Sequence, residues 1–581
     1  MNAIEKKESW LNSDKVDDVY KKQIMEASDE EIKDMFSSSL YFGTAGVRSI
    51  LGPGSSRLNT LTVKRMTVGV ALFLLKNYTL KDCKERGVAI SFDNRHYSKE
   101  FRDIAAKVLT EMGISVHTFI DPHPTPELSY TVRKLHCIGG IMITASHNTK
   151  EYNGYKFYDE NGCQGVYEHI DDLIKIINEL PDELEITYGV EPKDRQGSIN
   201  YLDSDEDFDN EFIETEVSTS LYKDVFKGQR LTKIVFSPEC GCNCKVGPMA
   251  LSKAGYEVKT VPNQDFFDPD FTGTNSPNPE VDAAYEGAYT LLRTLNANNE
   301  QYNLILATDP DADRCGLAFI NSKGEIERFN GNQTGALLLD FRLKTLKNRN
   351  CLDSNGYICN TFVTSSQGEK IAKMYGQKVK TTATGFKYIG DLIEKSKDEK
   401  FLFGYEESYG YLIVDFARDK DSLQSIINIA DMCEYYLRQG KTLDVAYRDL
   451  CLKTGQYYNS QVSLYFKGAQ AKDIMNSEVT KLRDNPPSVI ADSNVITLYD
   501  YLNRTITDFA KNETKELGES YVDKTNCLKF MLKDGFIAIR PSGTEPKVKI
   551  YFEVIGKSEK DAKIEVEKRA KHLKEILNFV E

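Results

Sequence analysis

The sequence predicts an α/β protein with several domains, on three observations. Its 581 residues exceed what one hydrophobic core accommodates, and at roughly 100–200 residues per domain they suggest about three to five domains. Short β-branched runs alternate with segments of helical periodicity over most of the chain. Hydrophobic residues make up 40% and charged residues 28%, which excludes collagen-like, disordered and coiled-coil proteins.

The order of the predicted elements gives the domain organisation. New strands at Lys233 and Tyr357 predict boundaries near 205 and 325, and the acidic run 203–210 is a linker or a capped helix start. From residue 456 onward the chain reads as strands followed by a Lys/Glu-rich helix over 558–577, typical of a separate α+β domain. The predicted strands are 87–91, 138–144, 233–237, 304–308 and 357–363, with a helix over 100–112.

Charge and hydropathy restrict the partners and the compartment. The net charge of −14 argues against a nucleic-acid or anionic-membrane surface. No apolar segment follows the charged N-terminus, and the apolar stretch 68–75 is far below the ~18 residues of a membrane span. We expect a cytoplasmic monomer or weak dimer. Cys240, Cys242 and Cys244 suit free thiols in a loop better than a zinc site, because their alternating spacing is wrong for a zinc knuckle.

A serine directly follows the predicted strand 138–144, in the run Thr144-Ala-Ser146-His147-Asn148. Open α/β sheets place their chemistry beyond the carboxyl ends of strands, so Ser146 is a candidate nucleophile. The alternative is a turn serine that caps the next helix. The Gly-x-Ser-x-Gly pattern of hydrolases is absent. We expect His147, as the adjacent residue, not to face the Ser146 oxygen.

A run of carboxylates follows the strand 304–308, in Asp309-Pro-Asp311-Ala-Asp313-Arg314. Carboxylates at i, i+2 and i+4 can converge on one hard cation, and three of them leave coordination open for a phosphate oxygen, as in Mg²⁺ sites. The EF-hand pattern fails because its glycine and its final glutamate are missing. The alternative is a charged surface turn.

Two later segments suit a phosphorylated sugar. The run 404–411 carries Glu406, Glu407 and Ser408, which can bind the hydroxyls of a polyol or form a solvated turn. The run 540–547, Arg-Pro-Ser-Gly-Thr-Glu-Pro-Lys, offers hydroxyls, a glycine N–H and cations to a phosphate, or forms a type II turn. A Walker A sequence is absent, so a nucleoside triphosphate is not implied. Together the four segments predict phosphoryl transfer on a sugar phosphate.

These segments resemble the motifs of the α-D-phosphohexomutase superfamily, in the family's order and over nearly the whole chain. The match extends to Gly43-Thr-Ala-Gly-Val-Arg48, Asn153-Gly-Tyr-Lys156 and Thr384-Gly-Phe-Lys387. The chain looks most like the long α-phosphoglucomutases, a branch that includes phosphopentomutases. The resemblance implies three α/β domains and a smaller C-terminal α+β domain around a central cleft. The expected domains are 1–205, 206–323, 324–455 and 456–581.

The resemblance also implies a mechanism. Ser146 carries a phosphoryl group and transfers it to glucose 1-phosphate, which gives glucose 1,6-bisphosphate and then glucose 6-phosphate. One Mg²⁺ ion is held by the Ser146 phosphate and by Asp309, Asp311 and Asp313. Lys156, Arg48 and His147 complete the catalytic set. The residues expected to bind the substrate are Arg314, Lys387, Glu406, Ser408, Arg540, Ser542, Gly543, Thr544 and Lys549.

Departures from the family pattern keep alternatives open. Thr149 replaces a frequent proline, Cys240 stands where a histidine is usual, and Tyr411 disfavours a bifunctional phosphomannomutase. Phosphopentomutase and phosphomannomutase activities therefore remain alternatives to phosphoglucomutase activity. A metal-dependent phosphatase, which often needs several histidines, and a non-catalytic sugar-phosphate sensor are remoter ones.

Overall fold

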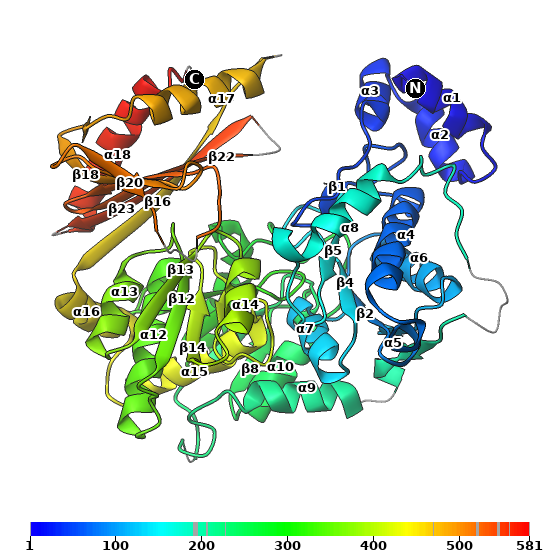
Figure 1. Ribbon diagram of the computed structural model, residues 1–581. Coiled ribbons are helices and arrows are strands. Elements are labelled where there is room, and N and C mark those ends of the chain that lie inside the picture. The colour runs from blue at the N-terminus through cyan, green and yellow to red at the C-terminus, as the bar shows by residue number, and fades with distance from the viewer. Residues whose placement is uncertain are drawn as a thin grey trace. The chain divides into compact units, whose positions relative to one another are not determined.

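The computed structural model describes residues 2–189, 196–204, 207–226, 228–468, 470–518, 522–542, 546–556 and 558–579. The chain divides into two compact units. Unit 1 comprises Met1–Asn330, Phe386–Asp398 and Ser408–Thr442, and unit 2 comprises Gly331–Gly385, Glu399–Glu407 and Leu443–Glu581. Figure 1 shows the elements of each unit. No helix of the described residues is both long and apolar enough to span a membrane.

The first sheet of unit 1 is mixed, with strand order β1-β5-β4-β2-β3-β6. Its strands are β1 (Val47–Ile50), β2 (Val88–Phe92), β3 (Val116–Thr118), β4 (Gly139–Ile143), β5 (Tyr152–Tyr158) and β6 (Ile199–Tyr201). The helices around it are α4 (Thr60–Asn77), α5 (Leu80–Glu85), α6 (Ser98–Glu111), α7 (Thr125–Lys134) and α8 (Tyr167–Glu179). Strand β2 is buried on both faces, as expected for a central parallel strand. Val88 and Ile90 pack with the cluster that contains α4, α6 and α8, whereas Ala89 packs with α7.

Three short helices precede this sheet: α1 (Ala3–Asn12), α2 (Asp18–Glu26) and α3 (Asp29–Phe36). They form their own apolar cluster around Trp10, whose ring meets Phe36 edge to face. The indole N–H of Trp10 donates to Glu183, which attaches the cluster to the segment after α8.

The second sheet of unit 1 has strand order β11-β10-β9-β7-β8. Its strands are β7 (Lys233–Ser237), β8 (Glu257–Thr260), β9 (Leu304–Thr308), β10 (Cys315–Ile320) and β11 (Ile326–Phe329). The remaining elements of unit 1 are α9 (Asp207–Val217), α10 (Asn243–Lys253), α11 (Glu286–Ala297), α14 (Phe386–Lys395), β15 (Tyr411–Leu412), α15 (Ser422–Leu437) and the 3₁₀ turns Leu202–Ser204 and Asp282–Tyr285. Helix α11 packs on Val235 and Ile305, and α15 contacts β9 and β10.

Unit 2 holds a parallel sheet and an antiparallel sheet. In the first, β12 (Gly356–Thr361) lies between β13 (Lys378–Thr382) and β14 (Lys400–Tyr405), with α12 (Gly331–Asn348), α13 (Gln367–Met374) and α16 (Leu443–Thr454) beside them. The second contains β16 (Gln456–Tyr465), β18 (Ser493–Asp500), β19 (Thr505–Asp508), β20 (Glu513–Glu516), β21 (Leu528–Leu532), β22 (Gly535–Pro541) and β23 (Lys547–Gly556), and β17 (Val489–Ile490) pairs with β18. Helices α17 (Ala471–Asp484) and α18 (Glu559–Ile576) share its apolar core.

The predicted elements compare closely with this fold. The strands 233–237 and 304–308 match β7 and β9, and the acidic run is a helix start in its described part, because α9 begins at Asp207. The last domain differs from the prediction of strands followed by one helix, since α17 comes between β16 and β17. Its buried residues Ala471, Met475, Val479 and Leu482 recur at helical spacing, so the sequence carries a signal that could have identified this helix.

Candidate active site

The serine loop follows β4 and turns sharply at Ser146. This residue has a left-handed backbone (φ 53°), and its N–H donates to Thr144 Oγ1 at 2.8 Å. A left-handed non-glycine residue costs on the order of 1 kcal/mol or more, so neighbouring contacts must maintain the turn. Ser146 is nonetheless 97% buried by the surrounding loops, which leaves its hydroxyl facing other side chains.

Arg95 supplies those contacts. It follows β2, and its guanidinium donates to the carbonyl oxygens of Ser146, Asn148 and Thr149. Its Nε lies 3.0 Å from Asp93 Oδ2, and neither side chain of this ion pair is exposed to solvent. Strands β2 and β4 are parallel neighbours, so their carboxyl ends bring Arg95 and the serine loop together.

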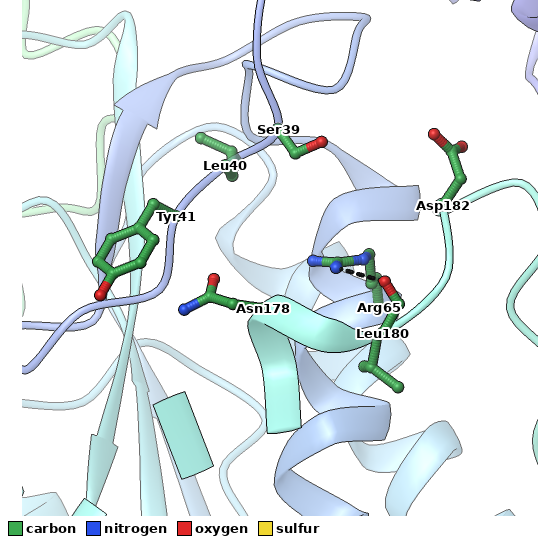
Figure 2. A pocket seen from close by; sticks show the side chains of 7 residues that line it. All are labelled: Ser39, Leu40, Tyr41, Arg65, Asn178, Leu180 and Asp182. Carbon is green, nitrogen blue, oxygen red and sulfur yellow. Dashed lines mark hydrogen bonds between the residues drawn. The ribbon is translucent and has the colours of Figure 1, made fainter. Parts of the chain in front are cut away.

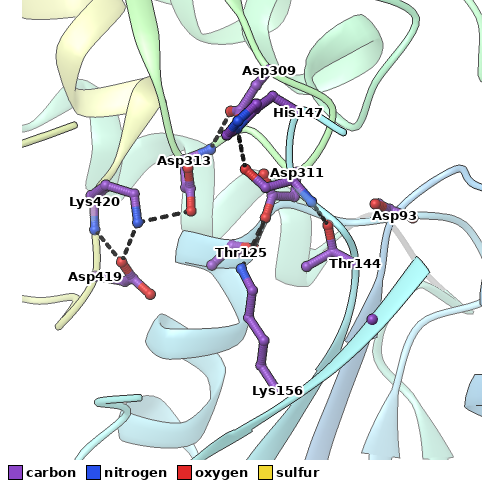
Figure 3. Close-up of polar contacts among 12 residues, drawn as sticks. Asp93, Thr125, Thr144, His147, Lys156, Asp309, Asp311, Asp313, Asp419 and Lys420 are labelled. Carbon is purple, nitrogen blue, oxygen red and sulfur yellow. Dashed lines mark hydrogen bonds and ion pairs between the residues drawn. The ribbon is translucent and has the colours of Figure 1, made fainter. Parts of the chain in front are cut away.

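The three aspartates of the second loop converge at the carboxyl end of β9. Asp309, Asp311 and Asp313 are each at most 1% exposed, and one oxygen of each lies within 4.8 Å of the others. Figure 3 shows them facing a common point. Ala312, between two of them, has a left-handed backbone that turns the carboxylates inward. The predicted metal-binding cluster therefore forms, and a charged surface turn is excluded by the burial.

The aspartate oxygens fit a bound cation. Asp309 Oδ1 accepts the N–H groups of Asp313 and Arg314 at 3.1 and 2.9 Å. By contrast, Asp311 Oδ1 and Asp313 Oδ1 are buried and have no hydrogen-bond partner among the described residues. An unpaired buried carboxylate oxygen is costly, and oxygen ligands of this kind suit Mg²⁺.

Two lysines offset the charge of the cluster. Lys156, on β5, lies 3.3 Å from Asp311 Oδ2, and Lys420 lies 2.9 Å from Asp313 Oδ2 (Figure 3). Burial and the charges of Asp311 and Asp313 raise the pKa of Asp309 well above its usual value. Burial also acts to raise the pKa of Asp311, but Lys156 and Lys420 outweigh it and hold that pKa below its usual value.

The nucleophile and the metal cluster are in contact. Ser146 Oγ donates to Asp309 Oδ2 at 2.9 Å, as the predicted shared metal site requires. Contrary to expectation, His147 Nδ1 also lies 3.2 Å from Ser146 Oγ. The expectation assumed that neighbouring side chains diverge, whereas the left-handed turn at Ser146 rotates them to the same side. Burial and the charges of Arg314 and Arg48 lower the pKa of His147 well below its usual value, which favours a neutral ring.

Four further predicted residues lie in unit 1 at different places. Arg48 donates to Asn148 Oδ1 at 2.8 Å, so it contacts the serine loop but not Ser146 itself. Arg314 lies 4.0 Å from Asp309 Oδ2 and pairs with Glu280 at 2.5 Å. Lys387, at the start of α14, is buried with its Nζ 5.0 Å from the centre of the Tyr388 ring. Ser408 is partly buried.

The remaining predicted residues lie in unit 2. Glu406 accepts the N–H of Gly385 at 2.8 Å, whereas Glu407 accepts the hydroxyls of Thr361 and Thr364. Arg540 on β22 stands directly opposite Lys549 on β23. Ser542 N–H donates to Lys547 O at 2.7 Å. Gly543 and Thr544 lie outside the described residues.

Neither the cysteine cluster nor a nearby pocket adds to this site. Cys240, Cys242 and Cys244 are buried free thiols, and none belongs to a group of potential metal ligands among the described residues. Gly241 between them is required by the metal loop, because a Cβ there would lie 2.4 Å from Pro310 Cα.

A cavity of about 310 Å³ elsewhere in unit 1 is lined by Ser39, Leu40, Tyr41, Arg65, Asn178, Leu180 and Asp182 (Figure 2). Its Arg65 donates to the carbonyls of Leu180 and Pro181.

Several contributors were missed by the sequence analysis. Thr125, at the start of α7, donates its hydroxyl to Asp311 Oδ2 at 3.1 Å and its N–H to Asp311 O at 2.9 Å. Asp419 accepts from Lys420 Nζ and from Tyr158 OH at 3.0 and 2.7 Å. Asp93 and Arg95 directly follow a predicted strand, a signal that could have identified them. Lys420 and Asp419 carry no comparable local signal.

A buried serine on a strand-to-loop turn, in contact with a cluster of aspartates that suits a cation, defines a phosphoryl-transfer class of site. Models of the four domains of the phosphoglucomutase/phosphomannomutase family match the chain. These are α/β/α domains I, II and III at residues 39–183, 211–322 and 330–453, and the C-terminal domain at 502–571. The chain belongs to this family. The predicted class of fold, three α/β domains and a C-terminal domain, is confirmed, and the finer boundaries stay a prediction.

Curated relatives agree with the family models. The chain is 36% identical over 519 residues to a phosphoglucomutase of Staphylococcus haemolyticus, a match that covers 89% of this chain and 90% of the relative. A Staphylococcus aureus phosphoglucomutase is 33% identical, with 94% and 95% covered.

Solved structures share the fold. The phosphoglucomutase parafusin of Paramecium, in its open form, superposes with a TM-score of 0.65 at 19% identity, covering 93% of this chain and 96% of its own. A phosphoglucomutase/phosphomannomutase family protein of Burkholderia thailandensis gives 0.64 at 17% identity, with 92% and 97% covered.

Proposed function

We propose that the protein is a phosphoglucomutase that interconverts α-D-glucose 1-phosphate and glucose 6-phosphate, with phosphorylated Ser146 as the resting enzyme. The observation that carries the proposal is the 2.9 Å contact of Ser146 Oγ with Asp309 inside the buried aspartate cluster. The relatives named phosphoglucomutase, at 33–36% identity over about nine-tenths of the chain, support the choice of sugar.

The proposed reaction consists of two phosphoryl transfers. The phosphoryl group leaves Ser146 Oγ for the free hydroxyl of glucose 1-phosphate, and Oγ regains a proton as the bisphosphate forms. The 1-phosphoryl group of the bisphosphate then transfers to Ser146, which gives glucose 6-phosphate and restores the phosphoserine. The proton that the sugar hydroxyl releases in the first transfer passes to Ser146 Oγ. In the second transfer His147 Nδ1, 3.2 Å from Oγ, is positioned to take the proton of Ser146, which a neutral ring can accept, and to release it to the leaving oxygen of the sugar.

Charge stabilisation is the main contribution that phosphoryl transfer needs from a protein. Asp309, Asp311 and Asp313 would hold one Mg²⁺, which when bound neutralises charge on the phosphoryl oxygens. Lys156 sits beside Asp311 at 3.3 Å, and we assign to it and to Arg48 the offsetting of phosphate charge next to the serine. Arg95 is a positioning residue, because it binds the carbonyls of the serine loop.

Substrate binding is assigned to the remaining predicted residues as part of the proposal. Glu406 and Ser408 bind sugar hydroxyls, with Lys387 and Arg314 as further contacts to the substrate. Arg540, Ser542, Gly543, Thr544 and Lys549 bind the phosphate that does not react, a role that suits the cations and hydroxyls of this segment. We further propose that the protein acts as a monomer or weak dimer.

The test compares kcat/KM for glucose 1-phosphate, mannose 1-phosphate and ribose 1-phosphate, with Mg²⁺ and a trace of the matching bisphosphate. We expect glucose to be favoured by about a hundredfold or more, roughly 2.7 kcal/mol of transition-state preference. A preference for mannose or ribose would contradict the sugar assignment and leave the serine mechanism in place. Absence of turnover with all three sugars would contradict the mutase proposal itself.

The serine assignment has its own test. Intact mass should show a species about 80 Da heavier than the unmodified chain, and Ser146→Ala should lack both that species and the activity. Thr144→Val is the matched control, since it alters the same loop and keeps the nucleophile. If Ser146→Ala remained phosphorylated or active, another residue would carry the phosphoryl group.

A further inference from the structure

A second set of potential metal ligands lies in unit 1, away from the aspartate loop. Among the described residues, His123, Glu127 and Asp209 form the other group of three side chains whose ligand atoms lie within 4.8 Å of one another. His123 precedes α7, Glu127 lies in its first turn and Asp209 lies in the first turn of α9. The proposed phosphoryl transfer assigns no role to any of them.

His123 is oriented as a ligand. Its Nδ1 lies 2.9 Å from the carbonyl oxygen of Asp121, a contact in which the ring must donate. In the neutral ring this leaves the lone pair on Nε2, which lies 3.2 Å from Asp209 Oδ1. Two donors that are each about 2.0–2.2 Å from one ion lie roughly 3.0–3.4 Å apart, so this separation fits a shared cation. The ring is fixed by stacking on Phe119, with centroids 4.0 Å apart.

Glu127 gives the independent sign of a missing partner. Its side chain is fully buried, and neither carboxylate oxygen has a hydrogen-bond partner in the part of the chain that the structure describes. A carboxylate taken out of water without hydrogen bonds is costly and is normally paired with a cation or a metal. Both Glu127 oxygens therefore need a partner that the protein does not itself supply through a hydrogen bond.

Further acids surround the group. Glu216 on α9 and Asp421 at the start of α15 are fully buried. Burial and the charges of Asp209 and Asp421 raise the pKa of Glu127, and the charge of His123 acts against them. Asp209 is the most accessible ligand, with 28% of its side chain exposed, and provides a path from solvent.

We propose that His123, Glu127 and Asp209 bind a divalent transition-metal ion of the Zn²⁺ type, separate from the Mg²⁺ cluster. One imidazole nitrogen and two carboxylates suit Zn²⁺ or its neighbours in the first transition row, whereas Mg²⁺ prefers oxygen ligands throughout. The carbonyl that accepts from His123 Nδ1 has the orienting role that such sites give to the second nitrogen of a histidine ligand.

The ion would act by stabilising a loop that supports the active site. Between His123 and Glu127 lies Thr125, which donates twice to Asp311. The backbone N–H of His123 donates to Phe92 O, next to Asp93. An ion bound at both ends of this short segment would hold Thr125 against the aspartate loop, so its role is structural and not catalytic.

The test is Zn²⁺ binding to the full-length protein by equilibrium dialysis and metal analysis, in saturating Mg²⁺. We compare the wild type with Asp209→Asn, Glu127→Gln and Asp311→Asn, with Asp207→Asn on the same helix as the matched control. We expect Asp209→Asn and Glu127→Gln to lose one equivalent of Zn²⁺, or to bind it at least tenfold more weakly. Asp311→Asn and Asp207→Asn should retain that equivalent, and Zn²⁺ should raise their Tm as it raises that of the wild type.

The opposite result is well defined. The proposal is overturned if Asp209→Asn and Glu127→Gln bind as much Zn²⁺ as the wild type does. It is also overturned if Asp311→Asn binds none. A third result that overturns it is a wild type that binds no Zn²⁺ in saturating Mg²⁺. In that case a protonated His123 is the partner of both carboxylates. Because Asp209 is partly exposed, its asparagine variant is expected to fold. Zn²⁺ binding is measured without turnover, so failure of the mutase proposal would not affect the result.

Discussion

Two clusters of potential metal ligands meet the start of α7, one through the contact of Thr125 with Asp311 and one through Glu127, and they are prepared for a cation differently. Asp311 and Asp313 each contact a lysine, at 3.3 and 2.9 Å. Glu127 has no hydrogen bond to its carboxylate among the described residues, and burial raises its pKa to about 8. Lys156 and Lys420 outweigh burial at Asp311 and hold its pKa below the usual value, whereas the charge of His123 does not outweigh burial at Glu127. The comparison teaches that burial alone does not make a charged ligand; neighbouring cations decide it.

The largest difference between the clusters should appear in catalysis. Asp311→Asn removes a proposed metal ligand and should lower kcat on the order of a thousandfold. Asp209→Asn, in the other cluster, should change kcat by less than about threefold, because that cluster has a structural role. Steady-state assays with glucose 1-phosphate measure both. Equal losses in the two variants would erase the functional distinction between the clusters.

A second prediction concerns the buried pair that holds the serine loop. Arg95→Met leaves Asp93 as an unpaired buried charge and should cost about 3–5 kcal/mol of unfolding free energy. It also releases the carbonyls of the loop and should lower kcat about a hundredfold. Arg86→Met is the matched control, because Arg86 pairs with the exposed Glu160 and should cost about 1 kcal/mol or less. Urea denaturation and kinetics should separate the two, and an equal loss of stability would count against the buried pair.

A third prediction tests the role of the lysines directly. Lys420→Met removes the cation 2.9 Å from Asp313, so the pKa values of the aspartates rise. Charged aspartates are then lost at a higher pH, and the acid limb of the kcat/KM profile should move toward neutrality. The Mg²⁺ concentration for half-maximal activity should increase about tenfold. Lys344→Met, which breaks an ion pair with Asp340 in unit 2, should leave both quantities unchanged.

The last prediction is a pH dependence of stability that comes from a third buried acid. Burial raises the pKa of Glu239 to about 8, above its usual value of 4.5. The folded state therefore binds a proton that the unfolded state has released, and this stabilisation is lost as pH rises from about 4.5 through 8. The stability of Glu239→Gln minus that of the wild type should therefore be larger near pH 9 than at pH 5. Thermal melts of both proteins across this pH range measure the difference. If it were the same at every pH, Glu239 would already be charged in the folded protein and the prediction would be wrong.

Much of the site was predictable because its residues follow strands. Ser146 and the three aspartates come directly after β4 and β9, and the edge rule of α/β sheets applies to them. Arg95 follows β2 in the same way and was overlooked because an arginine after a strand is not a chemical motif by itself. The contact between His147 and Ser146 was predicted wrongly, since a left-handed backbone at a serine has no sequence signal.

The sequence by itself determined the class of fold, the order of the motifs and the residues that can carry phosphoryl transfer. Periodicity and motif spacing are local properties, and local interactions suffice to express them. Only the tertiary structure decided which charges meet: Lys420 with Asp313, Thr125 with Asp311, and His123 with Asp209. These pairs are separated by 107, 186 and 86 positions along the chain, respectively. Electrostatic energy depends on distance in space and on burial, and neither quantity exists until the strands and helices have packed.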